Sequence, residues 1–256
     1  MTGKTICIAN QKGGVGKTTT AINLGTAIAL HKKKTLIVDI DPQGNAGSGI
    51  GKKGDGGPNI YHSLVLGESI TSTIQKTDIP NLFFAPSTID LTGAEIELVS
   101  LSEREYRLRK ALESIKGDFD YIFIDCPPSL GLLTINSLVA ADTVLIPLQC
   151  EYYAMEGLSQ LVNTIKLVKS SLNPDLMLEG ILLTMFDKRN NLSHQVAKEI
   201  MQHFPTRIFK VIIPRTVRLA ECPSHGKPIF LYDKNSIGSK SYFELAKQVL
   251  NKERNQ

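Results

Sequence analysis

Hydrophobic residues fall into short apolar runs, separated by longer stretches in which apolar residues recur every three or four positions. The runs are rich in β-branched residues, as expected for parallel strands that are buried on both faces. They lie at Thr5–Ala9, Thr35–Ile40, Leu82–Ala85, Tyr121–Ile124, Thr143–Pro147, Gly180–Thr184 and Ile208–Ile213. Helical periodicity is clearest at Thr18–Leu30, Arg104–Ile115, Gly157–Ser170 and Leu192–His203. This alternation predicts an α/β fold with a doubly wound, mostly parallel sheet and helices on both faces.

The segment Gly44–Pro58 interrupts this pattern, because seven of its fifteen residues are glycine. Such a segment is too glycine-rich for a helix or a central strand, and it predicts a mobile surface loop. No proline-rich or serine-rich linker divides the chain. We therefore expect one domain over residues 1–256, ending in an amphipathic helix at Ser241–Arg254.

The composition indicates a globular protein and excludes several other classes. With 42% hydrophobic and 21% charged residues, the chain is neither disordered nor a collagen or coiled coil. The first residues lack the apolar region of a secretory signal, and no run of about 18 apolar residues predicts a membrane span. The four cysteines show no metal-binding spacing. We expect a reduced, cytoplasmic protein without disulfides.

The formal charge of +4 is unevenly distributed. Residues 184–256 hold 13 Lys and Arg against 6 Asp and Glu, whereas the first 183 residues hold 16 against 19. A localised basic surface is typical of proteins that bind a polyanion, although a solvated helix face would also explain it.

The strongest chemical signal is the sequence QKGGVGKTT at residues 11–19, between the first predicted strand and the first predicted helix. Glycines allow successive backbone amides to face one anion, and the helix N-terminus adds its dipole at the same place. The Lys17 ammonium would reach the β- and γ-phosphates, and the Thr18 hydroxyl would bind Mg²⁺. The residues expected to hold the nucleotide are Lys12, Gly13, Gly14, Val15, Gly16, Lys17, Thr18 and Thr19.

This loop is a variant of the usual phosphate-binding sequence, because Gln11 occupies the position of its first glycine. The variant also contains a second cation, Lys12. Backbone amides and Lys17 are already expected to bind the phosphates of the nucleotide in the same subunit, and two lysine ammonium groups on one triphosphate would repel each other. Lys12 is therefore a candidate to reach a nucleotide held by a second copy of the chain.

Two apolar strands end in carboxylates. Asp39 and Asp41 lie on the same side of the second strand, and Asp125 ends the Tyr121–Ile124 run. We expect Thr18 to bind Mg²⁺ directly, and Asp39 and Asp125 to contact it through water. Asp41 is the candidate to orient or deprotonate the attacking water in ATP hydrolysis, so Lys12, Lys17 and Asp41 form the predicted catalytic set.

The chain resembles the ParA-type partition ATPases, and among them the short chromosomal form often called Soj. The resemblance rests on residues 12–19, 39–45 and 125–129, and extends through residues 150–153, 184–187, 213–218 and 224–228. It implies an ATP-dependent sandwich homodimer in which Lys12 crosses to the partner's phosphates. It also implies nonspecific binding of double-stranded DNA, and slow hydrolysis stimulated by a ParB-type, centromere-binding protein.

The resemblance has further consequences. The cargo is a chromosome or a plasmid, and the protein is expected in the cytoplasm on the nucleoid. Larger plasmid relatives carry an N-terminal helix-turn-helix domain, which is not expected here because the phosphate loop begins within the first dozen residues. The turns that contain Met185 and Pro214 fall where relatives hold adenine.

DNA contacts are expected in the basic final third, because nonspecific binding requires a surface of cations. Arg215 and Arg218 follow Pro214 on a predicted exposed turn and are favoured. Pairing with Glu221 or Glu244 is the competing explanation for some of these cations. The candidates are Arg189, Arg215, Arg218, Lys227 and Lys247.

Three other functions share parts of this pattern. A MinD-like membrane ATPase would use the closing helix, but its few basic residues are interleaved with Glu244 and Glu253, which favours packing on the sheet. An iron–sulfur protein of the nitrogenase type would need a second cysteine near the subunit interface beside Cys126, and the segment around Ala85 has none. A non-enzymatic DNA-binding scaffold would not need Lys17 together with Asp41.

Overall fold

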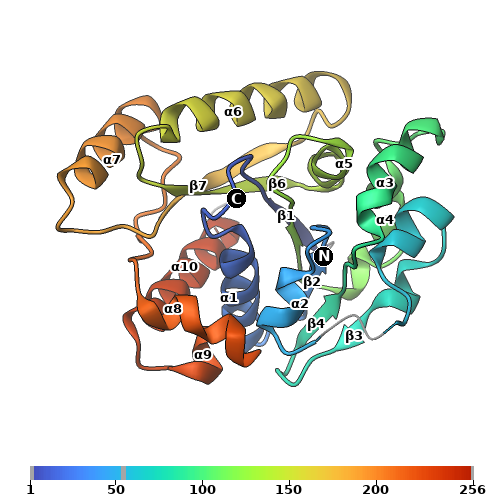
Figure 1. Ribbon diagram of the computed structural model, residues 1–256, viewed down its shortest axis with the longest axis horizontal. Helices are drawn as coiled ribbons and strands as arrows, with labels where there is room; N and C mark the ends of the chain where they lie inside the picture. Colours follow the sequence, from blue (N-terminus) through green and yellow to red (C-terminus); the bar gives the residue numbers. More distant parts are fainter. Residues whose placement is uncertain (1–2, 53–55, 255–256) are drawn as a thin grey trace.

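The apolar runs form the central sheet of the molecule. In the computed structural model, which describes residues 3–52 and 56–254, seven strands pair in the order β3-β4-β2-β5-β1-β6-β7 (Figure 1). Only the β3–β4 pair is antiparallel. The strands are β1 Lys4–Ile8, β2 Thr35–Asp39, β3 Gln75–Lys76, β4 Leu82–Ala85, β5 Tyr121–Asp125, β6 Thr143–Gln149 and β7 Met177–Thr184. The predicted doubly wound, mostly parallel sheet is confirmed.

Helices connect the strands and lie against both faces of the sheet (Figure 1). The α-helices are α1 Lys17–Leu30, α2 Asn45–Gly49, α3 Leu91–Glu97, α4 Arg107–Glu113, α5 Leu132–Ala140, α6 Ala154–Ser171, α7 Asn191–His203, α8 Val217–Glu221, α9 Ile229–Tyr232 and α10 Ile237–Arg254. Short 3₁₀ or π turns lie at His62–Leu66, Ile70–Thr73, Leu98–Ser100, Lys116–Asp118 and Cys222–His225.

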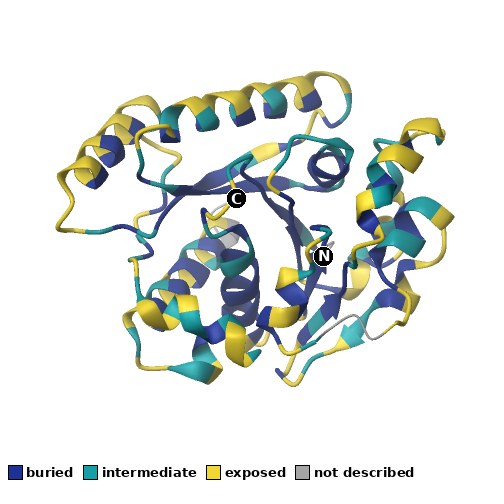
Figure 2. Ribbon diagram, in the orientation of Figure 1, coloured by how far each residue is buried: buried dark blue, intermediate teal, exposed yellow. Residues whose placement is uncertain are grey.

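Two hydrophobic cores, one on each face of the sheet, hold these layers together. Along β2, Leu36 and Val38 enter the core beneath α3–α7, whereas Ile37 enters the core beneath α1, α2, α9 and α10. Both side-chain directions are therefore buried, which explains the continuous apolar runs. Figure 2 shows the strands buried and the outward faces of α6 and α7 exposed.

Two predictions about local structure were wrong. Ile208–Ile213 lies beside β7, but it forms isolated bridges through Ile208 and Pro214 and no strand. The Phe209 amide donates to Ile181 and the Ile213 amide donates to Leu183, so the segment has more residues between these bonds than β7 has, and the ladder is interrupted. The glycine-rich segment Gly44–Pro58 contains the short helix α2, which is anchored by the buried Ala46; its residues 53–55 lie outside the described residues.

The closing helix α10, which was predicted to pack on the sheet, packs chiefly against α1, and its apolar face enters the core on that side of the sheet. Leu245 and Val249 are fully buried, and Leu250 packs partly buried against the same core. This apolar face is therefore occupied by the protein's own core. Within residues 3–52 and 56–254, no helix combines the length and apolar character that a membrane span requires.

The parallel strands give the sheet two distinct edges. We call the edge that follows the last residues of β1, β2, β5, β6 and β7 the carboxyl edge, and the opposite edge the amino edge. Parallel pairing of Ile8 with Asp125, and of Asp39 with Asp125, places the ends of three neighbouring strands together at the carboxyl edge. Ligands of open α/β sheets bind at such an edge.

Candidate functional site

The predicted phosphate loop lies at the carboxyl edge, where β1 leads into α1. Gly14 and Gly16 have φ of 73° and 88°, in the left-handed region that favours glycine. The loop borders a cavity of about 420 Å³. The residues that line this cavity are Gly13, Gly14, Gly16, Lys17, Thr18, Thr19, Ile22, Asp41, Gln43, Asn45, Ser48, Pro128, Met185 and Pro223. The structure thus brings most of the predicted nucleotide-binding residues into one cavity.

Lys17 lies at the first position of α1 and is only 6% exposed. Its Nζ donates a hydrogen bond of 2.9 Å to the backbone carbonyl of Lys12. Burial lowers the pKa of Lys17, and the charges of Asp125 and Asp41 oppose that shift. A buried ammonium that lines a cavity and has one neutral acceptor is suited to bind an anion.

Asp125, at the end of β5, is fully buried, and neither of its carboxylate oxygens accepts a hydrogen bond of ordinary length from a described residue, although the Thr18 hydroxyl lies near enough to act on it. Burial raises its pKa well above the usual range, and the neighbouring charge of Asp39 adds to that shift, while the Thr18 hydroxyl opposes it. A buried carboxylate without a hydrogen-bond donor destabilises the folded protein unless a cation or a water molecule binds it. Its environment therefore fits a divalent cation near Thr18.

The two aspartates after β2 differ in their contacts. Asp39 accepts hydrogen bonds from the amides of Asp41 and Ala46 at 3.0 and 3.2 Å, so it braces the loop that leads into α2. Burial raises the pKa of Asp39 to about 7. Asp41 lines the cavity, and its Oδ1 accepts from the Gln43 amide at 3.0 Å.

The metal must obtain most of its ligands from outside the protein side chains. No group of three or more His, Cys, Asp or Glu side chains that could hold a metal is present in the described part of the chain. Mg²⁺ keeps several waters and takes few protein ligands when phosphates are present. Thr18 and the unpartnered Asp125, beside Lys17, fit that mode of binding.

A second, more apolar cavity of about 280 Å³ adjoins the first one, and both are lined by Gly16, Thr19 and Met185. Pro214 and the ring of Tyr242 line it as well, so the structure places both predicted adenine-binding turns beside the phosphate loop. The Thr184 hydroxyl donates to the Val15 carbonyl at 2.8 Å, which ties the end of β7 to this loop. Met185 has φ of 49°, which is uncommon for a residue other than glycine.

Lys12 does not line the phosphate cavity. Its ammonium forms an ion pair with Glu151, which follows β6. Sequence reasoning missed Glu151 as part of the site. Its position close to the carboxyl end of an apolar strand, where Asp39 and Asp125 also lie, was the signal that could have identified it.

The five predicted DNA-binding cations lie on exposed parts of the second half of the chain. Arg189 pairs with Asp187, Arg218 with Glu221 and Asp233, and Lys247 with Glu244. The pKa of Asp187 falls to about 2, mainly through its hydrogen bonds with Arg189. Arg215 and Lys227 form no ion pair within the described residues.

Cys126 lies against Cys7, with 3.3 Å between the two sulfur atoms, and both side chains are fully buried. Burial raises the pKa of Cys7 well above that of an ordinary thiol. These thiols face the core and not the protein surface. This arrangement disfavours the nitrogenase-type reading, which requires cysteines at a subunit interface.

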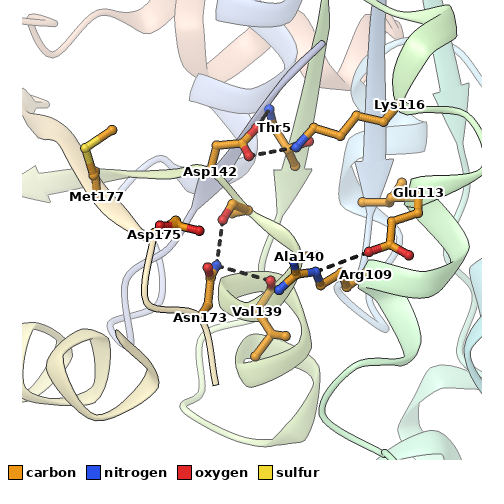
Figure 3. Close-up of a pocket in the computed structure, with 12 residues that line it drawn as sticks. Thr5, Arg109, Glu113, Lys116, Val139, Ala140, Asp142, Asn173, Asp175 and Met177 are labelled. Atoms are coloured by element: carbon orange, nitrogen blue, oxygen red, sulfur yellow. Dashed lines mark hydrogen bonds and ion pairs between the residues drawn. The ribbon is translucent and has the colours of Figure 1, made fainter. Parts of the chain in front are cut away.

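A cavity of about 380 Å³ at the amino edge provides a contrast (Figure 3). Asp142 accepts hydrogen bonds of 2.7 Å from both the Thr5 amide and the Lys116 ammonium. Asn173 donates to three backbone carbonyls, at Leu138, Val139 and Ala141. The Asp142 carboxylate and the Asn173 amide group are thus bound by neighbouring groups of the protein, as expected of a structural cavity.

Comparison with known proteins identifies the family. The family described as "AAA domain" matches residues 3–178. The sporulation initiation inhibitor protein Soj of Bacillus subtilis is 58% identical over 248 residues, which cover 96% of this chain and 98% of that protein. The chromosome partitioning protein ParA of Myxococcus xanthus is 58% identical over 252 residues, covering 98% and 89%.

Solved structures agree with this fold and site. A Mycobacterium smegmatis structure described as cobyrinic acid a,c-diamide synthase with bound ADP and magnesium has a TM-score of 0.86 and 36% identity, covering 98% of this chain and 96% of its own. A plasmid partition protein of Borrelia burgdorferi bound to AMPPNP has a TM-score of 0.81 and 29% identity, covering 98% and 99%. By its sequence relatives and by the geometry of its carboxyl edge, the chain belongs to the ParA/Soj family of chromosome-partitioning P-loop ATPases.

Proposed function

We propose that this chain is a DNA-segregation ATPase that pairs on binding ATP, binds DNA without sequence preference, and releases it after slow hydrolysis. As a ParA/Soj-type protein it is an ATPase, and ATP and Mg²⁺ are its cofactors. The observation that supports the nucleotide site best is the unpartnered, buried carboxylate of Asp125 beside Thr18 and Lys17. We infer that residues 1–256 act as one ATPase domain.

The loop residues bind and orient the triphosphate in this proposal. The amides of Gly13–Gly16 and the Lys17 ammonium hold the β- and γ-phosphates, and Thr19 and Met185 lie where the nucleotide passes into the apolar cavity. Mg²⁺, when bound, neutralises charge on the phosphate oxygens, with Thr18 as its direct ligand and Asp39 and Asp125 acting through water. Asp41 orients the attacking water or accepts its proton, which requires only a weak base.

Lys12 provides the proposed link between two subunits. It lies outside the phosphate cavity of its own subunit, where it pairs with Glu151, so it is not engaged by that subunit's own phosphate cavity. A related structure supports a partition role, since the Borrelia burgdorferi relative is described as a plasmid partition protein. A ParB-type protein would then stimulate hydrolysis, and the cargo would be a chromosome or a plasmid.

The proposed DNA surface comprises Arg189, Arg215, Arg218, Lys227 and Lys247. Arg215 and Lys227 are the cations among them that are exposed and form no ion pair with a described residue. An ammonium or guanidinium without a carboxylate partner does not have to break an ion pair when it binds a phosphate. Two copies of this surface in an ATP-bound dimer would hold DNA on the nucleoid through many weak contacts.

The proposal is tested by measuring binding of an unrelated DNA duplex with ATP and with ADP at several salt concentrations. We expect ATP, but not ADP, to produce dimers that bind DNA. Replacing Arg215 by Ala should weaken binding equally for all sequences and reduce the log-log salt slope by about one. Equal DNA binding with ATP and ADP would contradict the role, and an unchanged slope in the double variant Arg215→Ala/Arg218→Ala would place it elsewhere.

A further inference from the structure

Lys12 is held at three points in the free subunit. Its amide donates to Oδ1 of Asn10 at 3.0 Å, and its carbonyl accepts from Nζ of Lys17 at 2.9 Å. Its own ammonium forms the ion pair with Oε2 of Glu151. A solvated lysine in a glycine-rich loop would have none of these restraints.

Neighbouring strands carry these restraints. Asn10, after β1, is 5% exposed and donates Nδ2 to the Pro147 carbonyl of β6 at 2.8 Å. Glu151 lies in the short connection between β6 and α6. Since β1 and β6 pair side by side, the loop and Glu151 are fixed relative to each other, and Lys12 is directed toward the end of β6.

The two lysines of the loop therefore face different carboxylates. Lys17 is buried in the field of Asp125 and Asp41, whereas Lys12 is neutralised by Glu151 at the surface. This separation keeps the Lys12 charge from the phosphate cavity of its own subunit. It also means that Lys12 must leave a carboxylate before it binds any other anion.

We propose that Glu151 is a positioning residue that restrains Lys12 in the free subunit, and that this ion pair breaks when Lys12 reaches a nucleotide held by a second copy. The inference rests on the proposed function, in which Lys12 crosses between subunits. Phosphate binding by Lys17 removes one restraint, because the Lys12 carbonyl loses its ammonium donor. Pairing of two subunits then removes the second restraint, which makes dimerisation depend on the bound nucleotide.

The size of the effect follows from exposure. The Lys12 and Glu151 side chains are 41% and 39% exposed, and an ion pair at such a site shifts an equilibrium by roughly 1.4- to 5-fold. A symmetric dimer breaks two such pairs, so the combined effect is roughly 2- to 30-fold. Glu151 thus sets the nucleotide and protein concentrations at which dimers form.

The test compares dimer dissociation constants by sedimentation velocity in a non-hydrolysable ATP analogue with Mg²⁺. Glu151→Gln removes the charge and keeps the side-chain shape, and we expect dimers that are roughly 2- to 30-fold tighter. Glu156→Gln is the matched control, because Glu156 is exposed in the first turn of α6 and pairs with no cation in the described residues. It should leave the constant unchanged, and in a Lys12→Ala background Glu151→Gln should have no effect.

A second measurement separates failure of this inference from failure of the proposed function. Acylation of Lys12 by acetic anhydride in the ADP-bound monomer, followed by mass spectrometry, should be faster in Glu151→Gln than in the wild type. An unchanged acylation rate would overturn the proposed restraint. So would a Glu151→Gln dimer that is no tighter than the wild-type dimer, and in both cases the proposed dimerisation would still stand. Faster acylation with no dimer in any variant would support the ion pair, but it would overturn the crossing role of Lys12 and with it the proposed function.

Discussion

The two edges of the central sheet carry cavities of similar size but opposite electrostatic character. At the amino edge, the Asp142 carboxylate is bound by the Thr5 amide and the Lys116 ammonium (Figure 3). At the carboxyl edge, the Asp125 carboxylate accepts no hydrogen bond of ordinary length from a described residue and has only the Thr18 hydroxyl as a neighbouring donor among them, and Lys17 donates to a neutral carbonyl. The comparison teaches that a ligand site is recognised by buried charged groups that lack an opposite charge or hydrogen-bond partner in the protein. Where such groups are already paired with one another, a ligand gains little by binding to them.

The largest expected effect is the loss of ATP binding in Lys17→Ala. Removing the ammonium that faces the phosphates should weaken ATP binding roughly 100- to 1000-fold, measured by calorimetry. Lys116→Ala, which removes a lysine from the amino edge, is the matched control and should keep wild-type affinity. An equal loss of ATP affinity in both variants would contradict the claim that only the carboxyl edge binds the nucleotide.

Hydrolysis should depend on Asp41 more than binding does. Asp41→Ala should slow ATP turnover roughly 30- to 100-fold while ATP affinity stays close to that of the wild type, because positioning of the water is lost. Phosphate release and calorimetry provide the two readouts, and an ATP-bound dimer should accumulate. Wild-type turnover would mean that another group positions the water.

Asp125→Asn should stabilise the nucleotide-free protein. Asp125 ionises near pH 4 in the unfolded chain, whereas burial raises its pKa in the folded protein. The folded state therefore holds more protons above about pH 4, and this group makes the wild type less stable as pH rises. Urea unfolding should show a difference below about 0.5 kcal/mol at pH 4 and about 1–2 kcal/mol in favour of Asp125→Asn at pH 8.

A wild type that is the more stable protein at pH 8 would show that Asp125 has a partner in the folded state. The pH 4 measurement serves as the internal control, since the folded wild type is then uncharged at this position and the unfolded chain is only about half ionised.

The smallest expected effect is at the amino edge. Asp142→Ala leaves the buried Thr5 amide without its acceptor and should cost about 1 kcal/mol of unfolding free energy, with ATP affinity unchanged. Glu113→Ala, which removes only the exposed ion pair with Arg109, should cost less than about 0.5 kcal/mol. A loss of ATP affinity in Asp142→Ala would show that the two edges are coupled.

The sequence predicted the sheet and the phosphate site because both depend on local patterns. The apolar runs that end in Asp39 or Asp125 predict buried parallel strands, and the carboxylates at their ends predict a binding site at the carboxyl edge. Both signals can be seen in the sequence alone. The Ile208–Ile213 error arose because strand pairing is non-local: Phe209 packs over Gly180, while the Lys210 amide bonds to α10. No local signal in the apolar run reports these contacts.

Two contacts that the sequence did not predict, one in the core and one at the site, have the same origin. Cys7 and Cys126 are 119 positions apart in the sequence, and Lys12 and Glu151 are 139 positions apart. Only the strand order, with β1 between β5 and β6, brings each pair together. Residue chemistry identified Lys12 as unusual, but its partner required the fold.

The most direct test of the central claim is the shift in melting temperature that Mg²⁺ adds to ATP, measured for the wild type, Asp125→Asn and Asp142→Ala. Ligand binding to the folded state raises this temperature by mass action. We expect a clear Mg²⁺-dependent shift in the wild type and in the less stable Asp142→Ala, and little or none in Asp125→Asn, despite its higher starting temperature. A full Mg²⁺-dependent shift in Asp125→Asn, or its loss in Asp142→Ala, would contradict the claim that the incomplete charges of the carboxyl edge form the nucleotide site.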